Sequence, residues 1–231
     1  VLLQELKCQT DQFPKEEMSH LPYNLYIHGE KSYNGVAILS KKPADQINVS
    51  FIDNPLHNQA RFIEITQQTS IGYCRVISLY MPNGGEIDSD KFSKKINFLE
   101  KFISYVKKIK SFDEILIVGG DFNVAPFDID VFDPVKLHNT TCFSMLERRL
   151  MRKLINSGLE DNYRAIHPED SEFTWWDYRA GAFEQNKGMR IDTILTSPKA
   201  LKFLKEAVIE YDWRQKSKPS DHAPFIAIYS N

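Results

Sequence analysis

The chain has 231 residues, of which 42% are hydrophobic and 26% are charged, so it has the composition of a globular protein and is long enough to bury a large core. Its formal net charge of −2 lacks the basic excess of most nucleic-acid-binding proteins, although a carboxylate-rich metal site would lower the charge while lysines elsewhere contact phosphates. No apolar run reaches membrane-spanning length, no signal peptide is recognisable, and the odd number of cysteines, three, argues against a disulfide framework. We therefore expect one domain over residues 1–231, in a soluble cytoplasmic monomer that does not bind membranes.

The part of the chain before Tyr80 contains short segments in which apolar and polar residues alternate, the pattern of β-strands. An apolar strand at the start ends in Glu5, a candidate metal ligand. Asn34-Gly35 predicts a hairpin turn into the next strand. Asn83 lies in the loop after Tyr80, so a phenol and an amide stand at the mouth of this loop. The strands are expected at residues 1–5, 23–28, 36–39, 61–65 and 74–80.

Two amphipathic helices are expected. In the first, from Asp90 to Lys110, apolar residues recur every three or four positions, and Asp90 is the expected N-terminal cap. Its seven lysines lie largely off the apolar face, which favours a solvated surface over a phosphate-binding stripe. The second helix begins with a capping box between Ser144 and Glu147 and ends at Gly158.

The stretch from Glu114 to Asn123 is the centre of the pattern. Residues 115–118 are all apolar and predict a strand that is buried on both faces. Gly119-Gly120 would let the backbone turn sharply at the carboxyl end of this strand. Asp121 and Asn123 follow at once, where open α/β sheets bind ligands. A polar turn without a catalytic role explains these two residues equally well.

The last third of the chain contains a dense aromatic cluster at residues 173–179. If this segment is a strand, Trp175 and Trp176 point to opposite faces. Further strands are expected at residues 190–195 and 225–229. Several short alternating strands with few helices predict an α/β or α+β fold in which helices cover antiparallel sheets.

Polar side chains gather at the expected strand ends, and as a set they suit metal-assisted hydrolysis of a phosphodiester. Carboxylate oxygens suit the hard cation Mg²⁺, and a second carboxylate can take a proton from water. A histidine held by a carboxylate can stabilise charge on the phosphoryl oxygens. Taken singly, each residue is weak evidence, since turn chemistry explains an Asp or Asn after a strand and a core position explains a lone histidine. The set comprises Glu5, Tyr80, Asn83, Asp121, Asn123, Asp192, Asp221 and His222.

A series of motifs along nearly the whole chain resembles the exonuclease III class of apurinic/apyrimidinic endonucleases, within the endonuclease/exonuclease/phosphatase superfamily. Some of these motifs occur across the superfamily, whereas the Trp-Trp-Asp-Tyr-Arg run with the following Arg-Ile-Asp narrows the resemblance to the DNA-repair branch. The motifs are Leu-Gln-Glu ending at Glu5, Asn34-Gly35-Val36-Ala37, Tyr80-Met81-Pro82-Asn83-Gly84, Gly120-Asp121-Phe122-Asn123, Trp175-Trp176-Asp177-Tyr178-Arg179, Arg190-Ile191-Asp192 and Ser220-Asp221-His222-Ala223-Pro224.

The resemblance implies a four-layer α/β sandwich of two mainly antiparallel sheets flanked by helices, with the site at one end of the sheets. By position, Glu5 is the implied principal metal ligand, and Asp221 lies beside the metal. The implied cofactor is Mg²⁺, with Mn²⁺ as an alternative. Asp121 is the implied group that activates water, and Asn123 is its orienting neighbour.

The resemblance also implies how the substrate is held. Asp192 and His222 form a hydrogen-bonded pair at the phosphate, and Tyr80 and Asn83 contact the scissile phosphate. Trp175 forms the aromatic wall of the pocket that receives a flipped-out abasic sugar. The implied partner is double-stranded DNA with abasic or 3′-blocked sites.

The implied activity is cleavage of DNA 5′ to abasic sites, with 3′-5′ exonuclease and 3′-phosphatase activities. A phosphoinositide or phospholipid phosphatase of the same superfamily is one alternative, against which the tryptophan cluster argues. A catalytically inactive DNA-binding protein is the other. It arises because the family has a first strand and a helix before the Leu-Gln-Glu segment, and this sequence starts without them, whether through a shortened sequence or in the natural chain.

Overall fold

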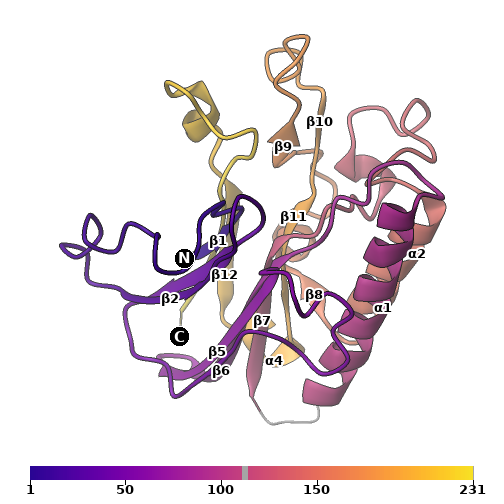
Figure 1. Ribbon diagram of the computed structural model, residues 1–231. Coiled ribbons are helices and arrows are strands. Elements are labelled where there is room, and N and C mark those ends of the chain that lie inside the picture. The colour runs from indigo at the N-terminus through magenta and orange to yellow at the C-terminus, as the bar shows by residue number, and fades with distance from the viewer. Residues whose placement is uncertain (111–113, 231) are drawn as a thin grey trace.

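A computed structural model of the chain describes residues 1–110 and 114–230. Its six-stranded sheet is antiparallel except where β6 and β7 run parallel (Figure 1). Parallel neighbours need a crossover connection, and helix α1 (Asp90–Ile109) lies in the segment that joins β6 to β7. In spatial order the strands are β4 (Gln46–Asn48), β5 (Phe62–Thr69), β6 (Gly72–Tyr80), β7 (Ile115–Asp121), β11 (Asp192–Thr196) and β8 (Glu160–Asp161).

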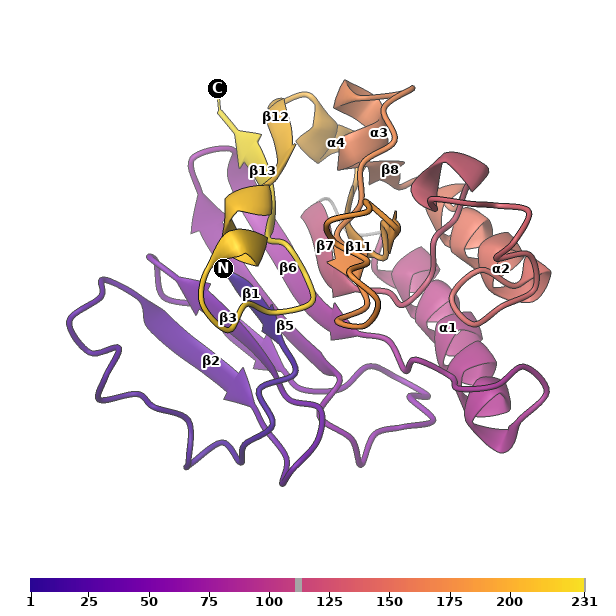
Figure 2. The same cartoon turned by 90° about the horizontal axis from the view of Figure 1, so that it is seen from above.

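Smaller sheets form a second layer on one face of the six-stranded sheet (Figure 2). One has the order β1-β3-β2, and apolar side chains of β3 pack on those of β5. The other pairs β12 with β13 beside β11. The α/β class and the two sheet layers are as predicted, the second layer being divided. Its strands are β1 (Leu2–Gln4), β2 (Asn24–His28), β3 (Val36–Ser40), β12 (Leu204–Ile209) and β13 (Phe225–Tyr229).

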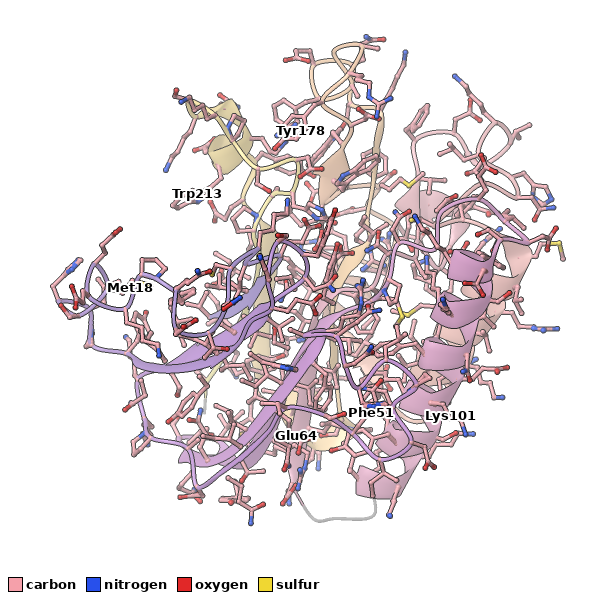
Figure 3. All side chains as sticks on the ribbon, in the orientation of Figure 1. Met18, Phe51, Glu64, Lys101, Tyr178 and Trp213 are labelled. Atoms are coloured by element: carbon pink, nitrogen blue, oxygen red, sulfur yellow. The ribbon has the colours of Figure 1, made fainter. Side chains whose placement is uncertain are left out.

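Helices α1 and α2 (Met145–Ile155) cover the opposite face of the six-stranded sheet (Figure 2). The side chains of Phe98 and Phe102 on α1 are fully buried, and both rings meet the ring of Phe51 edge to face. Figure 3 labels Phe51 next to helix α1. Ser144 and Glu147 form the predicted capping box of α2. Shorter elements lie in the connections: β9 (Trp175–Trp176), β10 (Gly188–Met189), α3 (Asn162–Ile166), α4 (Pro198–Leu201) and the 3-10 helices η1 (Asp128–Asp130) and η2 (Tyr211–Gln215).

Two local predictions are wrong. The backbone does not turn at Gly119-Gly120, because β7 continues to Asp121. Gly120 has φ of 145°, and a Cβ there would lie 2.0 Å from the carbonyl oxygen of Leu79, so the glycine permits close strand packing. The cap of α1 is Ser89 rather than Asp90, since the Ser89 hydroxyl accepts a hydrogen bond from the backbone of Phe92 at 3.1 Å.

The described part of the chain contains no helix that is both long and apolar enough to cross a membrane. Its three cysteines, Cys8, Cys74 and Cys142, are free thiols.

Candidate active site

Three strands of the six-stranded sheet bring polar side chains together at one end. In the pairing register, Tyr80 of β6 lies opposite Asp121 of β7, and Asp121 lies opposite Asp192 of β11. Residues opposite one another on neighbouring strands point to the same face of a sheet. This row therefore presents a phenol and two carboxyl groups side by side, although the three residues lie far apart in the sequence.

Strand β1 brings Glu5 to this row. The side-chain amide of Gln4 donates to the Ser78 hydroxyl at 2.9 Å, which fixes the end of β1 against β6. The Tyr80 hydroxyl donates to Oε1 of Glu5 at 2.8 Å, and Nζ of Lys7 lies 2.8 Å from Oε2. The Glu5 side chain remains 37% exposed, so its carboxylate is accessible to a ligand.

Asp121 is held by the residue two positions further on. Its Oδ1 accepts a hydrogen bond from the backbone N–H of Asn123 at 2.8 Å, and its Oδ2 accepts one from the side-chain amide at 2.9 Å. The φ of 48° at Asn123 folds the turn back on itself. Nδ2 of Asn83 donates to Oδ1 of Asn123 at 3.2 Å. The side-chain amides thus join the loop after β7 to the loop after β6.

The segment around His222 lies against β9 and the start of β11. The backbone N–H of Trp176 donates to the carbonyl of Asp221 at 3.0 Å. Nδ1 of His222 lies 2.7 Å from Oδ2 of Asp192, and the Trp175 indole N–H donates to Oδ2 of Asp221 at 3.0 Å. Trp176 is fully buried, whereas Trp175 is partly exposed. The two tryptophans therefore differ in environment, as their adjacency on a strand predicts.

Burial and neighbouring charges raise the pKa values of both Asp121 and His222. Burial raises the pKa of Asp121 to about 7, since the opposing influence of His222 is the smaller one. Burial lowers the pKa of His222, but the negative charge of Asp192 and its hydrogen bond outweigh this and raise the pKa to about 10. At neutral pH His222 is an imidazolium, and Asp121 titrates close to that pH.

Tyr80 and Glu5 are shifted in opposite directions. Burial and the neighbouring Glu5 carboxylate raise the pKa of the Tyr80 phenol, so it keeps its proton at neutral pH. Burial tends to raise the pKa of Glu5, but the hydrogen bonds from Lys7 and Tyr80 lower it overall. The site thus contains an ionised carboxylate beside a neutral phenol.

A divalent cation fits at Glu5. No group of three or more histidine, cysteine or carboxylate side chains is arranged to hold a metal within the residues that the structure describes. Mg²⁺, however, is commonly bound by one or two carboxylates together with waters and substrate phosphates. Glu5 offers an ionised, accessible carboxylate, and Lys7 is close enough to interact electrostatically with both Glu5 and Asp221. The available donors therefore suit an open site for a hard cation, and they do not form a closed structural metal site.

Two chain segments border the site face. Tyr178, after β9, is 64% exposed, and Trp213 on η2 is 53% exposed (Figure 3). The Tyr178 hydroxyl donates to the carbonyl of Pro219 at 2.8 Å. This hydrogen bond ties the aromatic segment to the segment that leads to His222.

Sequence reasoning missed several residues that contact the site. Lys7 pairs with Glu5, and Cys142 Sγ lies 3.7 Å from both the Asn83 amide nitrogen and Oδ1 of Asn123. Lys95 and Glu147 form a fully buried ion pair behind the two asparagines. Lys95 is an exception to the prediction that the lysines of α1 lie largely off its apolar face. Its position carried a signal, since it follows Phe92 by three residues and precedes Leu99 by four, on the buried stripe.

Residues 1–222 match the model of the Endonuclease/Exonuclease/phosphatase family. The chain belongs to this family. It is 34% identical over 235 residues to exodeoxyribonuclease III of Haemophilus influenzae, covering 98% of this chain and 88% of that protein. Among solved structures, the 3′ phosphatase NExo from Neisseria, bound to a product DNA hairpin, has a TM-score of 0.94 at 35% identity, with 99% of this chain and 88% of that chain covered. An AP endonuclease from Archaeoglobus fulgidus has a TM-score of 0.93 at 33% identity, with 100% and 88% covered.

The resemblance drawn from the motifs is confirmed, and so is the class of exodeoxyribonuclease III-like nucleases within the endonuclease/exonuclease/phosphatase family. Nucleases of this family depend on a divalent metal ion. The structure brings the predicted site residues of this chain to one end of its sheets. The roles of the individual side chains stay predictions.

Proposed function

We propose that this protein is a Mg²⁺-dependent DNA-repair phosphodiesterase that cleaves double-stranded DNA 5′ to abasic sites and also removes nucleotides and phosphates from 3′ ends. The observation that carries the proposal is the row of Tyr80, Asp121 and Asp192, with Glu5 and His222 bonded to its two ends. A base, neutral donors, an imidazolium and a cation-binding carboxylate lie together there. These are the groups that hydrolysis of a phosphodiester needs.

Asp121 is the proposed general base. A carboxyl with a pKa of about 7 exists partly as a carboxylate at neutral pH and is basic enough to take a proton from water. Asn123 holds both carboxyl oxygens and so fixes their direction. As the water oxygen bonds to phosphorus, its proton passes to Asp121, and the bond from phosphorus to the 3′ oxygen of the preceding nucleotide breaks. The 3′ oxygen leaves with the electron pair of that bond and takes a proton from solvent to become the 3′ hydroxyl.

Glu5 and Asp221 would hold the divalent cation, Mg²⁺ or Mn²⁺. When bound, this ion neutralises charge on the phosphate. Tyr80 keeps its proton beside Glu5, and the Asn83 side-chain amide lies at the loop after β7, where it donates to Asn123. Both groups are neutral, so they can donate to phosphate oxygens without adding charge.

His222 is the proposed cationic group for the phosphate. Its imidazolium is fixed by Asp192 at 2.7 Å and can stabilise the negative charge that grows on the phosphoryl oxygens. Trp175 is the proposed wall of the sugar pocket, because its indole is anchored on Asp221 beside His222 and remains partly exposed. An abasic nucleotide lacks a base to stack and is easily extruded into such a pocket.

Cleavage of a duplex that contains one synthetic abasic site tests the proposal. The parent protein should nick this DNA 5′ to the site in Mg²⁺, leave an intact duplex largely uncut, and lose activity in EDTA. Asp121→Asn should lower turnover roughly 10²–10⁴-fold, as loss of a general base does, while DNA binding is largely retained. Binding of abasic DNA without cleavage by the parent would support the inactive DNA-binding alternative. Hydrolysis of phosphoinositide vesicles instead of DNA would support the lipid phosphatase alternative.

A further inference from the structure

Lys95 is a fully buried cation on helix α1. Its ammonium group donates to the carbonyl of Asn83 at 2.9 Å, to the carbonyl of Asn123 at 2.7 Å and to the Glu147 carboxylate. An ammonium group has three hydrogens, so these three acceptors satisfy it completely. Two of the acceptors belong to the backbone of residues in the candidate site.

Glu147 fixes the position of this ammonium group from helix α2. Its Oε1 also accepts from the backbone N–H of Cys142 at 3.2 Å, and its Oε2 accepts from the backbone N–H and the hydroxyl of Ser144 at 3.0 and 2.6 Å. The carboxylate is fully buried. It is therefore both a member of the capping box of α2 and the counter-ion of Lys95.

The loop after β6 is shaped to admit Lys95. Gly84 has φ of 93°, and a Cβ at this position would lie 2.8 Å from Cδ of Lys95. A side chain at position 84 would thus displace the lysine from the Asn83 carbonyl. The lysine stem fills space that the glycine leaves open.

Stability alone does not explain why a buried ion pair stands at this place. Removing a cation and an anion from water carries a desolvation penalty that their attraction often fails to offset, and apolar residues of similar volume frequently serve stability equally well. An apolar side chain at position 95 cannot donate to the two asparagine carbonyls. Those carbonyls fix the backbone from which Asn83 and Asn123 direct their amides, and Asn123 in turn fixes Asp121.

We propose that Lys95 and Glu147 are positioning residues, which lock the loops after β6 and β7 to each other so that the Asn83 and Asn123 amides and the Asp121 carboxyl keep their reactive alignment. This proposal rests on the proposed function of those three side chains. The pair touches neither substrate nor cation and acts only through the loops that it joins. Its removal lowers turnover more than it lowers substrate binding, because small displacements of reacting groups cost about 10²-fold in rate.

The double variant Lys95→Met/Glu147→Gln tests the proposal, because it removes both charges without leaving either one unpaired. The control is Arg75→Met/Glu64→Gln, which neutralises a second buried ion pair, between strands β5 and β6 of the six-stranded sheet, with an N–O distance of 2.5 Å. Because Arg75 also pairs with Glu114, this variant loses at least as much charge pairing as the test variant. Both variants and the parent are compared by melting temperature, by kcat and KM on abasic DNA, and by hydrogen–deuterium exchange of residues 81–85 and 120–124.

We expect Lys95→Met/Glu147→Gln to lose roughly 10- to 100-fold in kcat with KM within about threefold, and to exchange faster in both loops. The control should keep kcat and loop exchange close to the parent, whatever its melting temperature. Equal losses of kcat in the two variants, or parental kcat in the Lys95→Met/Glu147→Gln protein, would overturn the proposal.

One alternative variant and one alternative measurement cover the cases in which the main experiment fails. Should the double variant not fold, Lys95→Arg replaces it, since arginine keeps the charge pairing with Glu147 while its wider, planar guanidinium cannot take the position of the ammonium between the two asparagine carbonyls. Should the parent not cleave DNA, the proposed function fails, and loop exchange alone decides whether the pair fixes the two loops; unchanged exchange would then reject it.

Discussion

Two tyrosine–glutamate hydrogen bonds lie along the six-stranded sheet, one at the site and one away from it. The Tyr80 hydroxyl donates to Glu5 at 2.8 Å, and the Tyr105 hydroxyl donates to Glu64 at 2.5 Å. In both pairs burial and the carboxylate raise the pKa of the phenol, so the tyrosine keeps its proton. The chemistry of the two pairs is thus the same.

The surroundings of the two carboxylates differ. Glu64 is fully buried and also accepts hydrogen bonds from Arg75 and Asn48, so its oxygens are committed within the protein. Glu5 is 37% exposed, and its second partner is Lys7, whose side chain is 63% exposed. An exposed ion pair of this kind contributes little free energy, so another cation can replace Lys7. The comparison shows that an accessible carboxylate with an exposed, replaceable partner distinguishes a ligand site from a structural network made of the same residue types.

The largest expected difference between the Tyr80–Glu5 pair and the Tyr105–Glu64 pair follows from replacing each glutamate by glutamine. Glu5→Gln should raise the Mg²⁺ concentration needed for half-maximal activity at least roughly tenfold, because even changes behind a metal ligand cost that much affinity. Glu64→Gln should leave the Mg²⁺ dependence unchanged but lower stability by about 1–3 kcal/mol, because it neutralises the fully buried one of the two carboxylates that pair with Arg75. Mg²⁺ titrations of nuclease activity and urea unfolding of both variants measure this.

The contrast would collapse if the two substitutions exchanged their effects. A Glu5→Gln protein with parental Mg²⁺ dependence would remove Glu5 from the cation site. A Glu64→Gln protein with altered Mg²⁺ dependence would mean that the site extends along the sheet.

The sequence predicted the site end better than the rest of the molecule. Sequence motifs identified Tyr80, Asp121 and Asp192, and the pairing register explains why they meet. Tyr80 and Asp121 end the parallel strands β6 and β7, and Asp192 begins the antiparallel strand β11, so all three lie at the same end of the sheet. Sequence patterns could not give the register itself. It depends on close packing such as that at Gly120, where strand β7 approaches the backbone of Leu79.

The buried polar residues behind the site escaped prediction for a physical reason. Lys95 has the residue type of a solvated helix face, and only its spacing on the apolar stripe indicates otherwise. Strand β12 (Leu204–Ile209) also gave no signal, since its exposed Lys205 and Glu206 interrupt the alternation. Tertiary contacts, which no local pattern contains, decide both cases.

A second expected difference separates the two adjacent tryptophans. Trp176 is fully buried among aromatic rings, including Phe183 at 5.1 Å between centroids, so Trp176→Ala should cost about 3–5 kcal/mol of stability. Trp175→Ala should fold nearly normally but lose discrimination between abasic and intact DNA, by roughly tenfold, since an apolar wall contributes selectivity of that order. Melting temperatures and paired cleavage assays measure both, and the reverse pattern would reject the pocket assignment of Trp175.

The smallest expected effect concerns the pH dependence of stability at the site end. The pKa of Asp121 rises from its ordinary value of 3.8 to about 7 on folding, so the folded state binds this proton more tightly than the unfolded state. The contribution is fully present below the unfolded pKa and is lost as pH rises through the folded pKa, so stability declines between about pH 4 and pH 7.

Asp121→Asn removes this titration. The melting temperature of the variant relative to the parent should therefore increase by roughly 5 °C between pH 5 and pH 8 in EDTA. Mispairing of the new amide with Asn123 contributes at every pH and cancels from this change. Leu99→Ala, a core variant on α1 without a titrating group, should give a difference that stays constant with pH. A constant difference for Asp121→Asn as well would mean that Asp121 is ionised throughout this range and is too weak a base for its proposed role.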